Sequence, residues 1–339
     1  MFYVKYEDIE KFKPEEVKSL DCSHRKIKDF KFLDKFVNLE ILDISNNNDS
    51  NISEYIPKSI KELYCKECNI SDFKFLEHLF NLEILDISKN INSNIYECNL
   101  PKSLKQLYCI QCNISDFKFL EMLSNLEILD ISENINSNIC DCELPQSLKK
   151  LYCKECNISN IKFIENLFNL ELLNIFLNNI TDLSNIKLSD KLIDFNCSCN
   201  IIKDFKFLEK LNNLIKLDIG HNDINSNIDK CNLPVSIVVL DCICNNITNF
   251  KFLENLINLK ELDVSFNFIY VNNDYDISNF TKCNLPLSLT KIRCVYFNIE
   301  DYSFLTRLVN LEVFITDPHY KEICKYVPPS VSIIYSLIK

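Results

Sequence analysis

The sequence contains one glycine and no tryptophan among its 339 residues, and no long uninterrupted apolar run. The scarcity of glycine excludes the glycine-rich loops that bind phosphates or nucleotide cofactors. No stretch approaches the ~18 consecutive apolar residues of a transmembrane helix, and the start, MFYVKYEDIEKFK, lacks the apolar core of a signal peptide. We therefore expect a cytoplasmic protein, in the source cell or in the host cell if the protein is viral, that uses no cofactor.

The chain also lacks a surplus of basic residues, since 37 Lys and Arg stand against 48 Asp and Glu, for a formal charge of -11. Nucleic acids and anionic membranes both require a concentrated basic surface. The composition therefore disfavours nucleic acid and membrane as main partners and leaves a protein partner.

One motif recurs along almost the whole chain, and its clearest copy is LKQLYCIQCNISDFKFLEMLSN, from Leu104 to Asn125. With Leu104 as position 1, apolar residues occupy positions 1, 4, 6, 9, 11, 14, 17 and 20. This is the pattern L-x-x-L-x-L-x-x-N/C-x-L. The chain resembles leucine-rich repeat proteins, and this copy is similar to their 22-residue variety, found in protein-phosphatase regulatory subunits. The abundance of Asn, Ile, Lys and Phe resembles the coding bias of AT-rich protists or giant viruses.

The resemblance implies an α/β fold, a right-handed solenoid with about 15 parallel strands on its concave side and short helices or irregular segments on its convex side. Residues 1–16 are expected to form an N-terminal cap, with Phe12 among the side chains that cover the end of the core, and residues 17–339 a single solenoid with an insertion near 270–277 and a truncated last repeat. The fifteen repeats begin at Val17, Leu39, Ile60, Leu82, Leu104, Leu126, Leu148, Leu170, Leu192, Leu214, Ile237, Leu259, Leu289, Leu311 and Val331.

Odd and even repeats differ, so the repeating unit is a pair of about 44 residues. Odd repeats end in segments such as Ser71–Leu79, where Ser or Asp precedes apolar residues at helical spacing and predicts a short capped helix. Even repeats carry Asn in that region and a proline three residues before the next repeat, except where Ser189 takes the place of that proline. The wording P-x-S-L-x-x-L, as in Pro101–Leu107, also resembles FNIP-type repeats.

The eighteen cysteines follow the repeat. Position 6 carries Cys in alternate repeats, which places these strands roughly 10 Å apart, beyond the ~4.4–6.8 Å Cα separation of a disulfide. We expect reduced, inward-facing thiols. The C-x-x-C pairs, such as Cys65 and Cys68, fall on positions 6 and 9 and are interpreted as core residues. The position-8 row Cys199, His221 and Cys244 is the one candidate for a nucleophile or a metal, but no pocket or oxyanion-hole motif accompanies it, so we expect neither catalysis nor a metal site.

Two groups of residues indicate where a protein partner binds. In the first half, position 5 alternates acidic and tyrosine side chains on the predicted concave face, a composition typical of recognition surfaces. From the eighth repeat onward, positions 7 and 8 become apolar and predict an exposed strip along the rim. The partner-binding candidates are Tyr64, Tyr108, Tyr152, Asp86 and Asp130 in the first group, and Phe176, Leu177, His221, Ile243, Phe266, Val295 and Tyr296 in the second.

These features predict a non-enzymatic intracellular protein–protein interaction module that binds its partner on the concave face. The alternatives that involve no partner are a solvated polar face for the first group and a strip covered by loops for the second. A different function is structural, with a homodimer formed through residues 331–339, where an apolar edge strand is expected to pair with a second copy.

Overall fold

The computed structural model describes residues 4–48, 52–223, 226–267, 278–297, 299, 301–318 and 323–336. The predicted insertion at 270–277 lies outside these residues. The chain divides into two compact units, residues 1–170 and residues 171–339. Each unit is built from stacked turns of the same kind.

Each predicted repeat provides one short strand that begins at position 2 or 3, and neighbouring strands within a unit run parallel in sequence order. The predicted leucine-rich repeat fold is therefore confirmed. In the first unit the strands are β1 (Val4–Lys5), β2 (Ser19–Asp21), β3 (Ile41–Asp43), β4 (Glu62–Tyr64), β5 (Ile84–Asp86), β6 (Gln106–Tyr108), β7 (Ile128–Asp130) and β8 (Lys150–Tyr152). In the second unit they are β9 (Leu172–Asn174), β10 (Asp194–Asn196), β11 (Lys216–Asp218), β12 (Val239–Asp241), β13 (Glu261–Asp263), β14 (Lys291–Arg293), β15 (Val313–Thr316) and β16 (Ser332–Tyr335).

Strand β1 belongs to the segment predicted as the N-terminal cap, and it pairs in parallel with β2. Arg25 bonds Glu7 at 2.7 Å, and the ring of Tyr6 lies 5.3 Å from that of Phe32. Phe12, expected to help cover the core, is instead 47% exposed.

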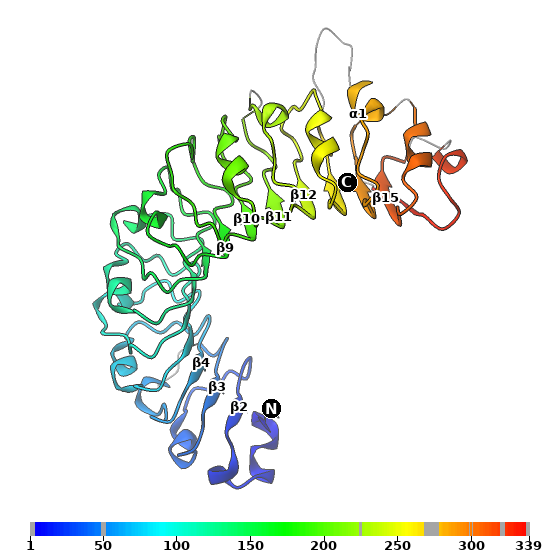
Figure 1. Ribbon diagram of the computed structural model, residues 1–339. Helices are drawn as coiled ribbons and strands as arrows, with labels where there is room; N and C mark the ends of the chain where they lie inside the picture. Colours follow the sequence, from blue (N-terminus) through cyan, green and yellow to red (C-terminus); the bar gives the residue numbers. More distant parts are fainter. Residues whose placement is uncertain are drawn as a thin grey trace. The chain divides into compact units, whose positions relative to one another are not determined.

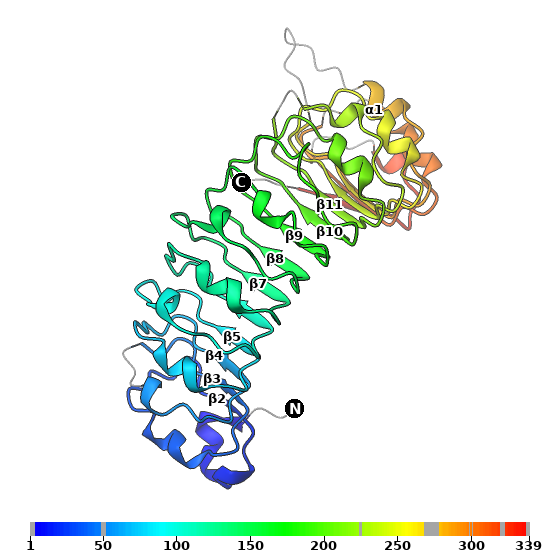
Figure 2. The same cartoon turned by 60° about the vertical axis from the view of Figure 1, so that its left-hand side comes forward.

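The strands stand side by side on one side of each unit, and the return segments lie on the other (Figure 1, Figure 2). Most returns contain a 3-10 helix, although the repeat that begins at Leu170 has none, and the described residues include one short α-helix, α1 (Ser278–Lys282). The 3-10 helices are η1 (Tyr6–Lys11), η2 (Pro14–Glu16), η3 (Lys31–Lys35), η4 (Ile52–Glu54), η5 (Lys74–His78), η6 (Ile95–Glu97), η7 (Lys118–Met122), η8 (Ile139–Asp141), η9 (Lys162–Ile164), η10 (Lys206–Lys210), η11 (Ile228–Lys230), η12 (Lys251–Asn255), η13 (Ser303–Arg307) and η14 (Ile323–Lys325).

The predicted helix cap takes a different form, since the N-cap residues Phe73 and Phe117 form no side-chain cap and the Asp one residue earlier bonds the first helical N–H. Asp72 accepts a hydrogen bond from the backbone N–H of Lys74 at 3.0 Å, and Asp116 does the same for Lys118. Because the helix that follows is only five residues of 3-10 type, each return stays short.

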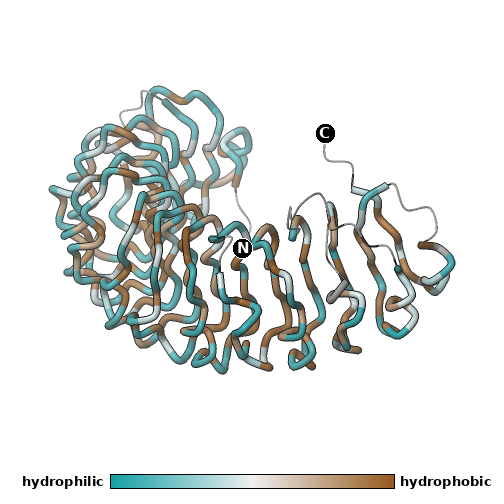
Figure 3. The backbone as a smooth tube through the Cα atoms, turned by 90° about the horizontal axis from the view of Figure 1, so that it is seen from above, coloured by the Kyte–Doolittle hydropathy of each residue, from teal (hydrophilic) through white to brown (hydrophobic). Residues whose placement is uncertain are grey.

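The core of each unit lies between the strands and the returns, and hydrophobic residues recur along every turn of the backbone (Figure 3). Leucine at positions 1 and 4 is fully buried in most repeats, as is phenylalanine at position 14, for example Phe73 and Phe117. Cys22, Cys109 and Cys197 at position 6 are 0% exposed, as predicted. These small apolar side chains fill the space behind the sheet.

The last strand differs from the prediction by one residue. The repeat pattern assigns Tyr335 to position 5, but it pairs with Thr316, the position-6 residue of the preceding repeat, and Ile334 pairs with Ile315 at position 5. A shift of one residue exchanges the two faces of a strand. Ile334, which the pattern places in the core, is accordingly 48% exposed.

Candidate binding surface

Where position 5 is aspartate, its carboxylate accepts a backbone N–H from the turn that follows the strand. Asp86 Oδ1 accepts the N–H of Ser88 at 2.9 Å, and Asp130 Oδ1 accepts that of Ser132 at 3.0 Å. In the second unit, Asp241 Oδ1 does the same for Ile243 at 3.0 Å. These carboxylates therefore stabilise the turn that follows the strand, whatever else they contact.

The alternation of Asp and Tyr at position 5 of the first unit is also explained by the hydrogen bond that the position-7 N–H requires. Tyrosine at position 5 leaves the position-7 N–H of its own repeat without a carboxylate. The serine at position 7 of the preceding repeat supplies the acceptor instead, because Ile110 N–H donates to Ser88 Oγ and Lys154 N–H to Ser132 Oγ, both at 3.2 Å. Every second repeat can thus dispense with Asp, which accounts for much of the pattern interpreted as a recognition surface.

The predicted tyrosines lean along their own strands. The hydroxyls of Tyr64 and Tyr108 each donate at 3.0 Å, to Glu62 and Gln106 respectively, two residues earlier. The ammonium of Lys154 lies 5.7 Å from the centre of the Tyr152 ring. The tyrosines are half-buried, and Asp130 is 8% exposed, so this group offers little free polar surface.

In most repeats position 9 carries Asn or Cys, and both donate to the same kind of backbone carbonyl. Asn90 donates through Nδ2 to the carbonyls of Cys65 and Ile87, at 2.9 and 2.7 Å. In the next repeat the thiol of Cys112 donates to the same Ile87 carbonyl at 3.2 Å. The second thiol of each C-x-x-C pair, at position 9, therefore takes the place of asparagine in the turn.

Position 8 adopts the left-handed backbone conformation in thirteen repeats, with φ between 50° and 63°, and none of these residues is glycine. In most of these repeats the N–H of the left-handed residue continues the ladder, as Glu67 to the Ser88 carbonyl at 2.9 Å and Phe266 to the Val295 carbonyl at 3.0 Å. The N–H of Tyr296 instead donates to Asp317 Oδ2 at 2.6 Å. In the first unit they are His24, Asn46, Glu67, Lys89, Gln111, Glu133 and Glu155; in the second they are Leu177, Cys199, His221, Cys244, Phe266 and Tyr296.

The structure thus brings most of the predicted strip together at the carboxyl ends of β9–β14. We call Leu177, Cys199, His221, Cys244, Phe266 and Tyr296 the rim. Leu177 and Tyr296 are 46% and 49% exposed, His221 is exposed, and Phe266 is half-buried. The rings of Phe266 and Tyr296 stack at 4.9 Å with an interplanar angle of 28°.

Position 7 contributes less to this surface than predicted. Phe176 and Ile243 are half-buried, whereas Val295 is 0% exposed and has its N–H bonded to Ser265 Oγ at 3.0 Å. Ser198 and Ser265 at the same position are also buried. Val295 therefore belongs to the core behind the strand ends, and the rim lies on position 8.

The sole glycine, Gly220, is explained by its neighbour on the rim side. A Cβ atom at Gly220 would lie 2.4 Å from Cγ2 of Ile243, the position-7 residue of the next repeat. Glycine lets the large Ile243 side chain lie across the adjacent strand end.

Beside the rim, the exposed sheet face of the second unit carries a column of carboxylates. Strand pairing aligns Asp218, Asp241 and Asp263 at position 5 of β11, β12 and β13. A hollow of about 190 Å³ lies next to this column, and it is lined by Val239, Leu240, Asp241, Glu261, Leu262, Asp263, Lys291, Arg293 and Ile315.

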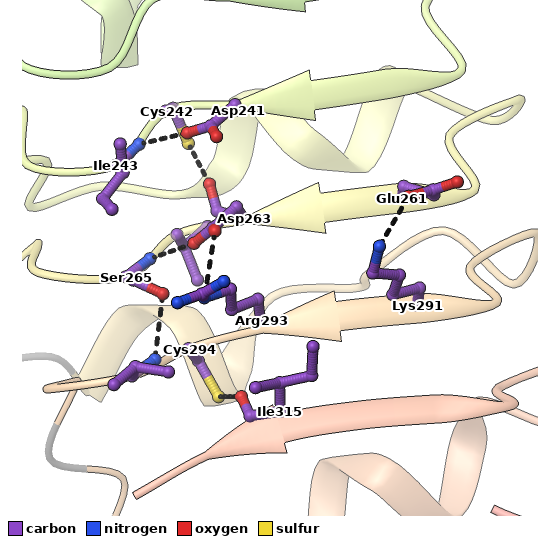
Figure 4. A network of polar contacts seen from close by, with 12 residues as sticks. Asp241, Cys242, Ile243, Glu261, Asp263, Ser265, Lys291, Arg293, Cys294 and Ile315 are labelled. Carbon is purple, nitrogen blue, oxygen red and sulfur yellow. Dashed lines mark hydrogen bonds and ion pairs between the residues drawn. The ribbon is translucent and has the colours of Figure 1, made fainter. Parts of the chain in front are cut away.

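Two ion pairs neutralise part of this hollow (Figure 4). Lys291 Nζ lies 3.0 Å from Glu261 Oε2, and Arg293 Nε lies 3.4 Å from Asp263 Oδ2. Burial first, and then the charges of Asp218 and Asp263, raise the pKa of Asp241 to about 7, although the N–H of Ile243 and the charge of Arg293 act in the opposite direction.

The row Cys199, His221 and Cys244 lacks the features of a nucleophilic site. Burial first, and then the charge of Asp218, raises the pKa of the Cys199 thiol, whereas an activated cysteine requires a lowered one. In the described part of the chain, no group of three or more His, Cys, Asp or Glu is arranged to hold a metal ion. No helix among the described residues is both long enough and apolar enough to span a bilayer.

The repeat pattern did not reveal two recurring polar contacts. In the P-x-S-L wording, the serine hydroxyl donates to the position-1 carbonyl of its own even repeat, as Ser103 to Leu82 at 2.7 Å. The last Asn of an odd repeat donates to the carbonyl that follows the preceding proline, as Asn125 to Lys102 at 2.8 Å. The recurrence of Ser after Pro was the available signal.

Comparison with known proteins supports the fold. No family model matches the sequence, and no curated protein does either. Among solved structures, the chain is similar to an internalin, InlF, of Listeria monocytogenes, with 20% identity, a TM-score of 0.71, and coverage of 96% of this chain and 88% of that one. A leucine-rich repeat protein of Leptospira interrogans has 19% identity, a TM-score of 0.63, and coverage of 98% and 100%.

A third structure, of a TLR13–ssRNA13 complex, has 19% identity and a TM-score of 0.56, with coverage of 86% of this chain and 49% of that one. These proteins share the strand-and-return architecture described above. The fold of the chain is therefore the leucine-rich repeat fold.

Proposed function

We propose that the protein is a non-enzymatic interaction module that binds a protein partner through the rim and the adjacent sheet face of the second unit. The observation that carries this proposal is the contrast at position 8. One backbone conformation recurs in both units, yet its side chains are polar throughout the first unit and mainly apolar or aromatic in the second.

The contrast is not required by the fold. A left-handed residue other than Gly or Asn costs on the order of 1 kcal/mol, and a bulky side chain gains nothing there unless it is buried. The first unit makes the same backbone turn with Asn46, Glu67 and Lys89. Exposed Leu177 and Tyr296 therefore favour a role in contact with another molecule.

The dimensions of the rim fit a peptide segment or a loop. Adjacent parallel strands lie about 4.8 Å apart, so the six rim residues on consecutive repeats extend over roughly 24 Å. The stacked pair Phe266 and Tyr296 provides a rigid aromatic anchor at one end. The chain's charge of -11 and the column of carboxylates beside the rim support a protein rather than a nucleic acid as the partner.

The test is affinity capture from cytoplasm followed by binding measurements on each purified candidate. A partner should bind the wild type and lose at least ~10-fold in affinity with Phe266→Ser/Tyr296→Ser, since truncated aromatic anchors cost about 2 kcal/mol or more. The matched control is Glu133→Ser/Glu155→Ser, at the same position of the first unit. Equal loss in both variants, or no loss in the first, would contradict the proposal.

A second candidate function is self-association through β16. Ile334, which pairs with the position-5 residue Ile315 of β15, is 48% exposed, and Tyr335 is 41% exposed. A second copy that adds a strand there would cover both side chains. Light scattering over a range of concentrations, with Ile334→Lys as the variant, distinguishes a dimer from a monomer.

A further inference from the structure

We infer that the bound segment of the partner carries a lysine or arginine that lies against Asp241. About three residues away, the same segment carries an aromatic or large aliphatic side chain that packs on Phe266 and Tyr296. This inference rests on the proposed function, because it specifies the chemistry of the partner at the same surface.

The second oxygen of each carboxylate in the column has a different environment. Asp218 Oδ2 accepts a hydrogen bond from Asn196 Nδ2 at 2.8 Å, and Asp263 Oδ2 faces Arg293 Nε. Asp241 uses Oδ1 to cap Ile243, and no described residue forms a hydrogen bond or an ion pair with its Oδ2. Asp241 is thus the carboxylate in the column with a free acceptor.

The charges around the hollow are balanced except at Asp241. Glu261 and Asp263 are matched by Lys291 and Arg293. This leaves Asp241 as the uncompensated charge among the lining residues, next to Asp218 on the neighbouring strand. A cation placed there would gain from two carboxylates and from a partly desolvated site, where charge-assisted hydrogen bonds are strongest.

The distance between Asp241 and the aromatic pair sets the spacing of the ligand. Phe266 lies three residues beyond Asp263, which pairs with Asp241 in the strand register. Because β13 ends at Asp263 and Phe266 lies in the corner that follows, these three residues cover at most about 10 Å, and the neighbouring strand adds about 4.8 Å sideways. An extended peptide that places its cation at Asp241 therefore reaches the aromatic pair with a side chain about three residues away.

The acidic and the aromatic side chains of this surface together favour one kind of ligand. A purely acidic surface would serve solubility, and a purely apolar one would suit a hydrophobic contact without a charge requirement. Their juxtaposition within one strand length favours an amphipathic segment of positive charge.

A phage-displayed random peptide library, selected against the full chain at pH 8, tests the inference. The selected peptides are then synthesised and titrated by calorimetry against wild type, Asp241→Asn and Phe266→Ser/Tyr296→Ser. Asparagine retains the acceptor for the Ile243 N–H, so Asp241→Asn should fold normally, as thermal unfolding will show. Asp86→Asn, at the same position in the first unit, is the matched control.

The expected result is a consensus of Lys or Arg about three residues from an aromatic or large aliphatic residue. Those peptides should bind Asp241→Asn about 10-fold or more weakly and Asp86→Asn within twofold of wild type. Peptides that require Phe266 and Tyr296 but carry no cation, or bind Asp241→Asn normally, overturn the inference and leave the proposed function intact. A library that yields no peptide dependent on Phe266 and Tyr296 overturns both.

Discussion

At the scale of single residues, the side chains with the clearest role are those that complete a turn. Asp at position 5, Ser at position 7, and Asn or Cys at position 9 each satisfy a backbone group of their own or an adjacent repeat. Leaving such groups unpaired in a buried turn would cost about 1–3 kcal/mol each. Polar residues that look like a binding surface in the sequence are therefore partly structural.

Asp241 gives a prediction about pH. Its folded pKa of about 7 lies above the ordinary value of 3.8, so between these limits the folded chain holds a proton that the unfolded chain has lost. Stability should therefore fall as the pH rises from about 4 to 7. The charged groups that act on Asp241 are Asp218 on β11, Asp263 on β13 and Arg293 on β14.

The measurement is urea unfolding of wild type and Asp241→Asn at pH 5 and pH 8. The variant should lose less stability between the two values, by about 1 to 4 kcal/mol, since each pKa unit corresponds to roughly 1.4 kcal/mol. The same pH dependence in both proteins would show that Asp241 keeps an ordinary pKa.

Gly220 gives a prediction about packing. Gly220→Ala would place a methyl group 2.4 Å from Cγ2 of Ile243, so the Ile243 side chain must move. We expect a loss of about 1–3 kcal/mol in the free energy of unfolding, typical of overpacking. In a double-mutant cycle, Ile243→Ala should recover most of that loss; additive effects would mean that the two side chains do not meet.

At the scale of elements, the corner after each strand keeps one backbone conformation while its side chain varies between repeats. Its backbone conformation is the same in both units, whereas its side chain is polar in the first unit and mainly apolar or aromatic in the second. Leu177→Asn should therefore raise the free energy of unfolding by about 0.5–1 kcal/mol, because Asn adopts the left-handed conformation more readily and Leu177 is 46% exposed.

The reverse change, Asn46→Leu in the first unit, should lower stability by a similar amount. Chemical unfolding of both variants is the measurement. Destabilisation by Leu177→Asn would indicate that Leu177 is packed in the fold, and that the rim is not a free surface.

Much of the element structure could be predicted because the repeat is strict. Leucine at positions 1 and 4 must be buried in the core, so the pattern predicts where each strand starts. Other features depend on contacts between repeats, which no single repeat encodes. The pattern alone did not determine which face of its strand Tyr335 occupies, and it did not distinguish the buried Val295 from an exposed rim residue. The left-handed corner could not be predicted either, because Leu and Phe at position 8 do not signal that conformation as Gly would.

At the scale of the whole molecule, the cysteines provide a simple test. The structure describes the side chains of seventeen of the eighteen, and none of these is in a disulfide; fourteen are buried, Cys199 and Cys244 are intermediate, and Cys140 is exposed. Titration of the native protein with a thiol reagent should modify Cys140 first and leave the buried thiols unmodified. After unfolding without reductant, all eighteen should react.

Reductant should likewise leave the unfolding midpoint unchanged, because no covalent link among the described cysteines constrains the unfolded chain. Fewer than eighteen reactive thiols in the unfolded protein would reveal disulfides and would contradict a reduced state.

The uniform corner has a consequence for engineering. Because the N–H groups of most corner residues bond backbone carbonyls, rim side chains can be exchanged between repeats without changing the scaffold. Tyr296, whose N–H bonds Asp317 Oδ2, is the exception. Transplanting Leu, Phe and Tyr onto Glu133, Glu155 and their neighbours, with the originals replaced by polar residues, would relocate any recognition specificity to the other unit.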